Sequence, residues 1–118
     1  DRFSMAREDQ EDSITATLGH GDSEVVISGE SFGTLGAFVD ALEKHSGHKL
    51  RILNYAEHAL SAGTRAEAIA YVELDVDGSQ QVGVATSQDT VGAMFKATLA
   101  ALNLELQSRQ RTEVQKVA

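Results

Sequence analysis

Tyr55, Glu57 and His58 place an aromatic ring, a carboxylate and an imidazole within four consecutive residues, in a segment without a regular hydrophobic period. A carboxylate beside an imidazole can carry out general acid and base chemistry, and the same pair can instead orient a loop. No cluster of metal ligands accompanies them in the sequence. We therefore expect Glu57 and His58 to shape this loop, with a small free-standing enzyme that uses them as an alternative.

The other histidines do not show a spacing typical of a metal site. His20 falls in a predicted turn, while His45 and His48 flank Gly47 at the predicted end of a helix, where a histidine pair is more often a solvated cap than a metal site. The chain has no cysteine, which excludes disulfides and thiolate chemistry. We expect no catalytic residue, no metal and no cofactor in this chain.

Two predicted turns between a strand and a helix could hold a small anion. Residues 29–33 read Gly-Glu-Ser-Phe-Gly, and residues 87–90 precede a second helix in the same way. Glycines there let backbone N–H groups face an anion at the helix N-terminus. The lysine of a P-loop and the full dinucleotide fingerprint are missing. The alternatives are a plain turn and a site for a small carboxylate, such as that of an amino acid.

The elements that would position these residues follow from the hydrophobic pattern. Residues 13–27 contain alternating apolar side chains around a glycine-rich turn, which predicts a hairpin. Thr34 is then predicted to be the N-cap of a helix that ends at Ser46 and Gly47. The apolar residues of this helix recur at helical spacing: Leu35, Phe38, Val39 and Leu42.

The second half of the chain repeats this order. A short strand at residues 50–53 is followed by predicted strands at 68–76 and 81–85, joined by a turn at Asp77 and Gly78. A helix then starts near residues 87–90, and its apolar pattern fades near Leu106. The residues on its apolar face are Val91, Met94, Phe95, Thr98, Leu99 and Leu102.

The two halves also align with each other, from Ser23 to Ala41 onto Ser79 to Ala97 without a gap. The identities cluster in Thr-Leu-Gly-Ala and Thr-Val-Gly-Ala at the two helix starts, and chance similarity between Ala-rich helices is the alternative to duplication. The predicted fold class is α+β, with two repeated strand-strand-helix (βββα-like) modules, antiparallel sheets and helices on one face.

A chain of 118 residues supports one modest core, so we expect a single domain. This domain would cover residues 13–106, with a first module at 13–47 and a second at 48–106. Residues 1–12 are predicted to be a flexible N-terminal segment and residues 107–118 a polar tail. Helices on one face leave apolar surface on the other, which predicts a homodimer.

Composition limits the partners of this chain. Its net charge of -8 repels phosphate backbones and anionic head groups, so we expect no nucleic acid and no membrane partner. No apolar run approaches the ~18 residues of a membrane span, and the charged first residues do not resemble a signal peptide. We expect a cytoplasmic protein and, because the sequence starts at Asp1 without Met, a piece of a longer chain.

One segment carries a family resemblance. Residues 54–74 read Asn-Tyr-Ala-Glu-His-Ala-Leu-Ser-Ala-Gly-Thr-Arg-Ala-Glu-Ala-Ile-Ala-Tyr-Val-Glu-Leu and resemble the C-terminal regulatory domain of 2-isopropylmalate synthase. The similarity extends over residues 29–42, 81–84 and 91–103. In that family the parent enzyme is an acyltransferase of leucine biosynthesis, which condenses acetyl-CoA with 2-oxoisovalerate on a TIM barrel that uses a divalent metal.

The resemblance implies an allosteric, non-catalytic module that dimerises and binds L-leucine, or a similar branched-chain amino acid, as feedback inhibitor. Its further partner would be the catalytic domain of the parent chain. Helix N-termini would hold the leucine carboxylate, nearby carbonyls and hydroxyls the ammonium, and small alanines would leave space for the isobutyl group. Gly33, Glu57, His58 and Gly63 would shape the loops. The implied ligand-binding positions are Leu35, Gly36, Ile52, Tyr55, Ala59, Ala66, Ala68, Ser87, Gln88, Asp89 and Thr90.

The chain departs from the family pattern at the first turn. The usual Gly-x-Gly-Asn-Gly-Pro reads Gly-Glu-Ser-Phe-Gly-Thr here, which places Ser31, Phe32 and Thr34 at altered positions, and Asn54 replaces the usual Asp. These changes leave open which branched-chain amino acid binds. The alternatives are the isoleucine-sensing domain of citramalate synthase and a dimerisation module that no longer binds a ligand.

Overall fold

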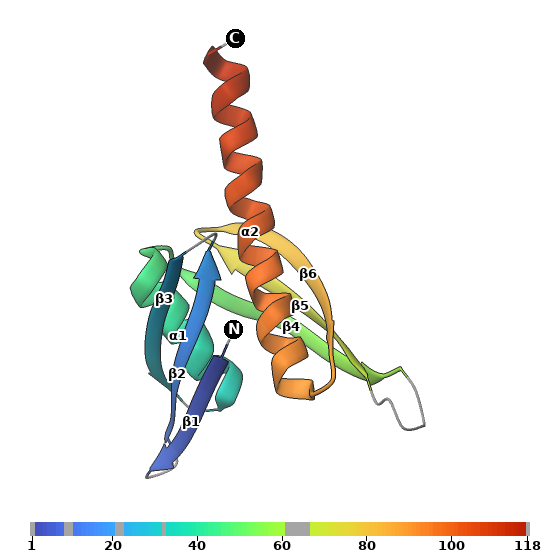
Figure 1. The fold of residues 1–118 in the computed structure, drawn as a ribbon. Helices are drawn as coiled ribbons and strands as arrows, with labels where there is room; N and C mark the ends of the chain where they lie inside the picture. Colours follow the sequence, from blue (N-terminus) through green and yellow to red (C-terminus); the bar gives the residue numbers. More distant parts are fainter. Residues whose placement is uncertain (1, 9–10, 21–22, 32, 61–66, 118) are drawn as a thin grey trace. The chain divides into compact units, whose positions relative to one another are not determined.

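The computed structural model describes residues 2–8, 11–20, 23–31, 33–60 and 67–117. The chain divides into two compact units, Asp1–Leu50 and Arg51–Ala118. Two three-stranded antiparallel sheets are each followed in the chain by a helix that packs on one face of the sheet (Figure 1). The fold is therefore α+β, as predicted from the sequence.

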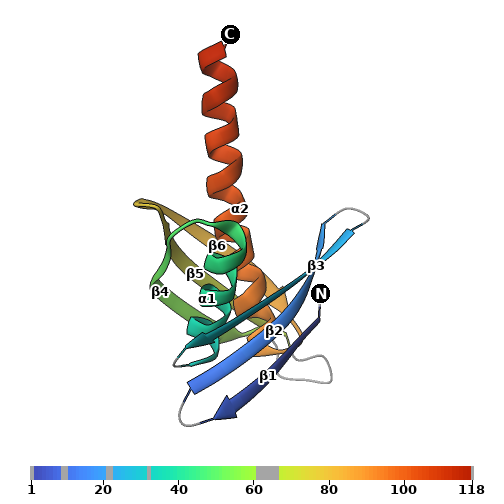
Figure 2. The same ribbon diagram turned by 90° about the vertical axis from the view of Figure 1, so that its left-hand side faces the viewer.

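In the first unit, β1 (Arg2–Glu8), β2 (Glu11–His20) and β3 (Ser23–Ser31) form an antiparallel sheet in that order. The helix α1 (Thr34–Ser46) packs against β2 and β3 (Figure 2). Alternate residues of these strands point toward the helix, because successive side chains of a strand face opposite sides of the sheet. The buried residues of this core are Ile14, Ala16, Ile27, Ala37, Phe38, Val39, Ala41 and Leu42.

In the second unit, β4 (Leu50–Ala59), β5 (Ala68–Val76) and β6 (Ser79–Ser87) form the sheet, and α2 (Thr90–Val117) packs on β5 and β6. Every second residue of β5 is buried from its first residue to its last. The turn between β5 and β6 has positive φ at both Asp77 (52°) and Gly78 (97°), which matches the tight hairpin predicted from Asp-Gly.

The internal repeat seen in the sequence is also present in the structure. The bounds of β3 and β6, and the first residues of α1 and α2, follow the same constant spacing that aligned the two halves. A serine at the end of each strand lies against a glycine in the first turn of the next helix. A Cβ atom on Gly36 would lie 3.1 Å from Ser31 Oγ, and one on Gly92 would lie 2.8 Å from Ser87 Oγ. These shared details support duplication of one βββα module.

Each helix lies directly on the backbone of a neighbouring strand at a glycine. A Cβ atom on Gly29 would fall 2.8 Å from Ala41 Cα, and one on Gly83 would fall 2.6 Å from Ala101 N. No side chain fits at either position without moving the helix, because protein interiors are close-packed. Small residues on both sides of the contact thus allow a dense core in a chain that has only 5% aromatic residues.

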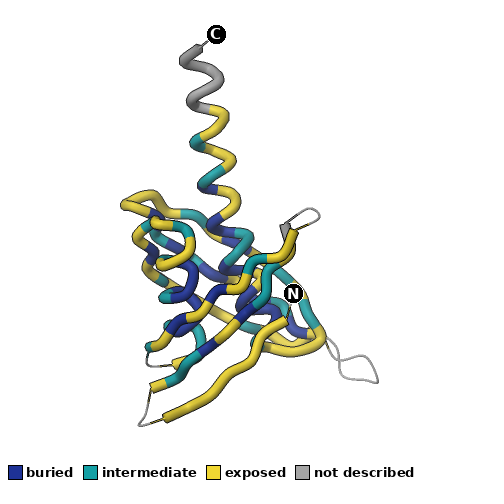
Figure 3. The backbone as a smooth tube through the Cα atoms, turned by 60° about the vertical axis from the view of Figure 1, so that its left-hand side comes forward, coloured by how far each residue is buried: buried dark blue, intermediate teal, exposed yellow. Residues whose placement is uncertain are grey.

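Three elements differ from the sequence prediction. Residues 2–8, which we expected to be flexible, form β1 and pair with β2, although all of β1 is exposed (Figure 3). Residues 54–59 continue β4 beyond its predicted end. Their side chains are mostly exposed and give no hydrophobic alternation, so the sequence pattern did not mark them as part of the strand. The helix α2 continues past Leu106 to Val117, through the residues that we expected to form a polar tail. Over the described residues, no helix is long and apolar enough to cross a membrane.

The predicted cap of α1 was wrong. Gly33 is the N-cap residue, with φ 84° and ψ 151°, and Thr34 is the first residue of the helix. No side chain of the described residues makes a hydrogen bond at this cap. A left-handed φ is easy for glycine and costly for other residues, which explains why the chain turns at Gly33. The predicted end of α1 is confirmed, because Gly47 is a left-handed C-cap and its N–H donates to Glu43 O.

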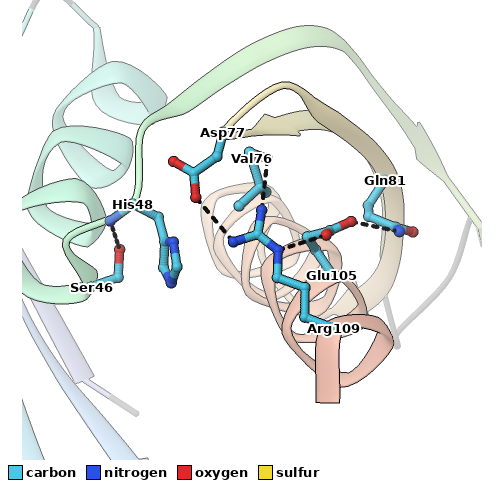
Figure 4. Close-up of polar contacts among 7 residues, drawn as sticks. All are labelled: Ser46, His48, Val76, Asp77, Gln81, Glu105 and Arg109. Atoms are coloured by element: carbon cyan, nitrogen blue, oxygen red, sulfur yellow. Dashed lines mark hydrogen bonds and ion pairs between the residues drawn. The ribbon is translucent and has the colours of Figure 1, made fainter. Parts of the chain in front are cut away.

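A polar network ties α2 to the hairpin between β5 and β6 (Figure 4). Arg109 Nε donates to Glu105 Oε2 at 2.8 Å, and its two other nitrogens donate to Asp77 Oδ2 and Val76 O at 3.1 Å each. Gln81 Nε2 donates to the second oxygen of Glu105 at 3.1 Å. These bonds satisfy both oxygens of a carboxylate that is 8% exposed and anchor the middle of the long helix.

Candidate functional site

A pocket of about 260 Å³ lies in the second unit, and its lining residues come from the end of β4, the start of β5 and the passage from β6 into α2. The end of β4 is held to the start of β5 by the N–H of Leu60, which donates to Glu67 O at 2.9 Å. Two alanines supply the small apolar side chains of the wall, and the remaining lining residues carry polar or ionisable groups. The lining residues are Glu57, His58, Ala59, Glu67, Ala68, Gln88 and Thr90.

The carboxyl group of Glu57 has an uneven environment in this pocket. Tyr55 Oη donates a hydrogen bond to Glu57 Oε1 at 2.9 Å. This bond needs the protonated phenol and therefore raises the pKa of Tyr55 above its ordinary value. The second oxygen, Oε2, is buried and has no hydrogen-bond partner among the described residues. One oxygen of Glu57 is thus held in place while the other has an unused acceptor capacity.

His58 lies next to Glu57 and contacts the neighbouring strand. Its ring meets the ring of Tyr71 edge-on, with centroids 6.1 Å apart and planes at 67°. Such T-shaped contacts fix the orientation of aromatic rings. His58 thus lines the pocket and packs edge-on against Tyr71.

The start of α2 is capped by an acidic side chain. Asp89 Oδ1 accepts a hydrogen bond from the N–H of Gly92 at 2.6 Å, and Asp89 O accepts one from the N–H of Ala93 at 3.1 Å. This side chain accepts the hydrogen bond of one N–H group in the first turn and adds a negative charge there. The N-terminus of α2 is therefore less suited to a ligand carboxylate than we expected from the sequence.

Four of the residues assigned by the resemblance line this pocket: Ala59, Ala68, Gln88 and Thr90. Glu57 and His58, expected to shape this segment, also line it, whereas Tyr55 does not line it and bonds to Glu57 through its hydroxyl. Sequence reasoning missed Glu67. A charged residue directly before the first buried position of a strand was the signal that could have found it.

The other assigned positions do not line the pocket in the part of the chain that the structure describes. Ile52, Ser87 and Asp89 belong to the second unit but are absent from its wall. Leu35 and Gly36 belong to the first turn of α1 in the first unit, next to the Gly33 cap. Gly63 and Ala66 lie outside the described residues.

The chemistry of the pocket fits binding of a small molecule. Within the described ranges, no group of three or more His, Asp or Glu side chains is placed to hold a metal ion. The pocket combines two carboxyl groups, an amide, a hydroxyl and small apolar walls, which can hydrogen-bond a cationic group beside an aliphatic one.

Comparison with known proteins identifies the family. Residues 3–106 match the family model described as the LeuA allosteric (dimerisation) domain. Similar proteins include the 2-isopropylmalate synthase of Thermobifida fusca, 49% identical over 82 residues, which are 70% of this chain and 14% of that protein. The enzyme of the same name from Mycobacterium leprae is 41% identical over 103 residues, 86% of this chain and 17% of that protein.

A more distant relative gives the same result. The 2-isopropylmalate synthase of Mesorhizobium japonicum is 37% identical over 90 residues, which are 76% of this chain and 16% of that protein. The chain thus spans about one sixth of the length of these relatives. Since the family model covers most of the sequence and both βββα units, this chain belongs to the LeuA allosteric (dimerisation) domain family.

Proposed function

We propose that this chain is the regulatory domain of a 2-isopropylmalate synthase and binds L-leucine. In this role leucine, the end product, inhibits the condensation of acetyl-CoA with 2-oxoisovalerate on the catalytic barrel of the parent protein. The chain itself takes no part in the chemistry. The relatives' names and the family description support this proposal.

One observation carries the proposal within the structure. The pocket of about 260 Å³ is lined by Ala59, Ala68, Gln88 and Thr90, four positions that the family resemblance independently assigns to leucine. Pockets for drug-sized ligands span about 300 to 1,000 Å³. A slightly smaller pocket suits a free amino acid better than a nucleotide or a coenzyme.

The lining residues suggest how leucine would lie. The methyl groups of Ala59 and Ala68 leave room for the isobutyl group and contribute apolar contact. Glu57, Glu67 and the hydroxyl of Thr90 provide acceptors for the ammonium group. Separately, Leu35 and Gly36 in the first unit stay proposed ligand contacts, because no side chain of the described residues caps α1 and competes for the N–H groups of its first turn.

The same proposal covers assembly and location. The family description includes dimerisation, and we propose that two copies of this domain form a homodimer in the parent enzyme. A biosynthetic enzyme that uses acetyl-CoA is expected to work in the cytoplasm.

The placement of leucine is tested by enlarging one alanine of the pocket. Ala59→Leu should abolish leucine binding in calorimetric titrations, because the added isobutyl group fills the space of the ligand. The control is Ala56→Leu, an exposed residue of the same strand that does not line the pocket. It should bind leucine as the unmodified chain does. Equal affinity in all three proteins would contradict the placement, and absence of binding to the unmodified chain would contradict the function.

A further inference from the structure

The unpartnered oxygen of Glu57 is a second clue to the ligand. Oε1 receives the phenolic hydrogen of Tyr55 at 2.9 Å, while Oε2 is buried and accepts no hydrogen bond from any described residue. Glu57 also lines the pocket proposed for leucine. A buried acceptor beside an open pocket is the arrangement expected where a ligand supplies the missing donor.

The cost of leaving such an oxygen unpaired sets the requirement on the ligand. A buried polar atom without a partner destabilises a protein, and the cost is larger when the group is charged. An ionised carboxylate only accepts hydrogen bonds, so its partner must be a donor, and a cationic donor forms the strongest bond. The ammonium group of an amino acid meets both conditions.

We infer that Glu57 Oε2 accepts a hydrogen bond from the ammonium group of the ligand, so that this site selects α-amino acids over 2-oxo acids of the same carbon skeleton. The inference rests on the proposed function and adds the group that reads the class of ligand. A 2-oxo acid has a carbonyl in place of the ammonium group and offers Oε2 no donor.

The charges around Glu57 also favour a ligand that has a cationic group. Glu67 is the second acidic residue of the pocket wall, and the wall contains no Lys or Arg among the residues described. Asp89 adds a further carboxylate at the start of α2. An acidic pocket attracts the cationic end of an amino acid and repels a ligand whose only charge is negative.

Tyr55 is a positioning residue in this arrangement. Its hydroxyl fixes Glu57 Oε1 and thereby sets the direction of Oε2. Tyr55 is itself 48% exposed. It does not line the pocket, so its effect on binding passes through Glu57.

The first experiment compares two ligands on the unmodified chain by calorimetric titration. Leucine should bind at least about tenfold more tightly than 4-methyl-2-oxopentanoate, which has the same skeleton without the ammonium group. Equal affinity for the two would overturn the inference and leave the leucine proposal intact. Absence of binding by leucine would instead overturn the proposed function and the inference together.

The second experiment uses Glu57→Gln with Glu73→Gln as matched control, since both remove one negative charge and Glu73 is not in the pocket wall. Glu57→Gln should weaken leucine binding about tenfold or more and reduce the preference over the 2-oxo acid, while the control keeps both. Unchanged binding by Glu57→Gln would overturn the inference.

Thermal unfolding without ligand separates binding from a structural role. The melting temperature of Glu57→Gln should not fall below that of Glu73→Gln, because the amide oxygen can still accept the hydrogen bond of Tyr55 and Oε2 makes no bond that would be lost. A clear fall would assign Glu57 to the stability of the fold and count against its role in recognition.

Discussion

Glu105 shows how a charged residue can be buried in a helix face made of small apolar side chains. Arg109, one turn further along α2, and Gln81 on β6 each donate to one of its two oxygens. The bond from Arg109, followed by that from Gln81, lowers the pKa of Glu105 below its ordinary value of 4.5. The ionised form is therefore the one that stabilises the folded state.

The sign of this shift predicts a dependence of stability on pH. A carboxyl group whose pKa is lower in the folded state contributes stability above its unfolded pKa and loses it as pH falls through the folded value. Glu105→Gln should therefore reduce the free energy of unfolding by about 1 kcal/mol near neutral pH. This difference should shrink when the pH is brought well below 4.5, the ordinary pKa of the group. Urea unfolding of both proteins across pH measures it, and a difference that stays constant in acid would contradict the assignment.

The family resemblance, and no pattern of residue types, led to part of this pocket. Ala59, Ala68, Gln88 and Thr90 were assigned from a resemblance and line one pocket. Glu67 was missed because its role depends on the backbone bond that brings its strand to the end of β4. Spacing along the chain could not reveal that Glu57 keeps one oxygen paired and one unpaired.

At the scale of elements, the contact between α2 and β6 depends on Gly83. Gly83→Ala would place a methyl group against the backbone of Ala97 and Ala101, so α2 would have to move away from the sheet. We expect a loss of about 3 kcal/mol or more in the free energy of unfolding. Val84→Ala, on the exposed face of the same strand, is the control and should cost far less. Chemical denaturation measures both, and similar losses would contradict the close approach.

The elements that could be predicted are those with a buried face. The strand β5 and the buried part of α2 have alternating or helical apolar patterns, and Asp77 and Gly78 have the residue types that a tight hairpin requires. The strand β1 and the end of β4 are held by backbone hydrogen bonds and have exposed side chains, so no pattern marks them. The cap of α1 was misplaced because Thr34 has good capping chemistry while Gly33 has the φ that the turn needs.

At the scale of the whole molecule, duplication gave two modules with different details. Gly33 precedes α1 without a side-chain cap, whereas Asp89 occupies the equivalent position before α2 and binds an N–H group of its first turn. The two helix N-termini therefore offer different chemistry, one open to an anion and the other already acidic.

The central claim is that this domain recognises a branched-chain amino acid, and thermal unfolding with added ligand tests it most directly. Leucine, isoleucine and valine are each titrated into the chain, and a bound ligand stabilises the folded state by RT ln(1 + [L]/Kd). Leucine should raise the melting temperature most, with an increase that follows this relation. No increase with any of the three would contradict it and would leave a dimerisation module without a ligand, while a larger increase with isoleucine would assign the site to a different branched-chain amino acid.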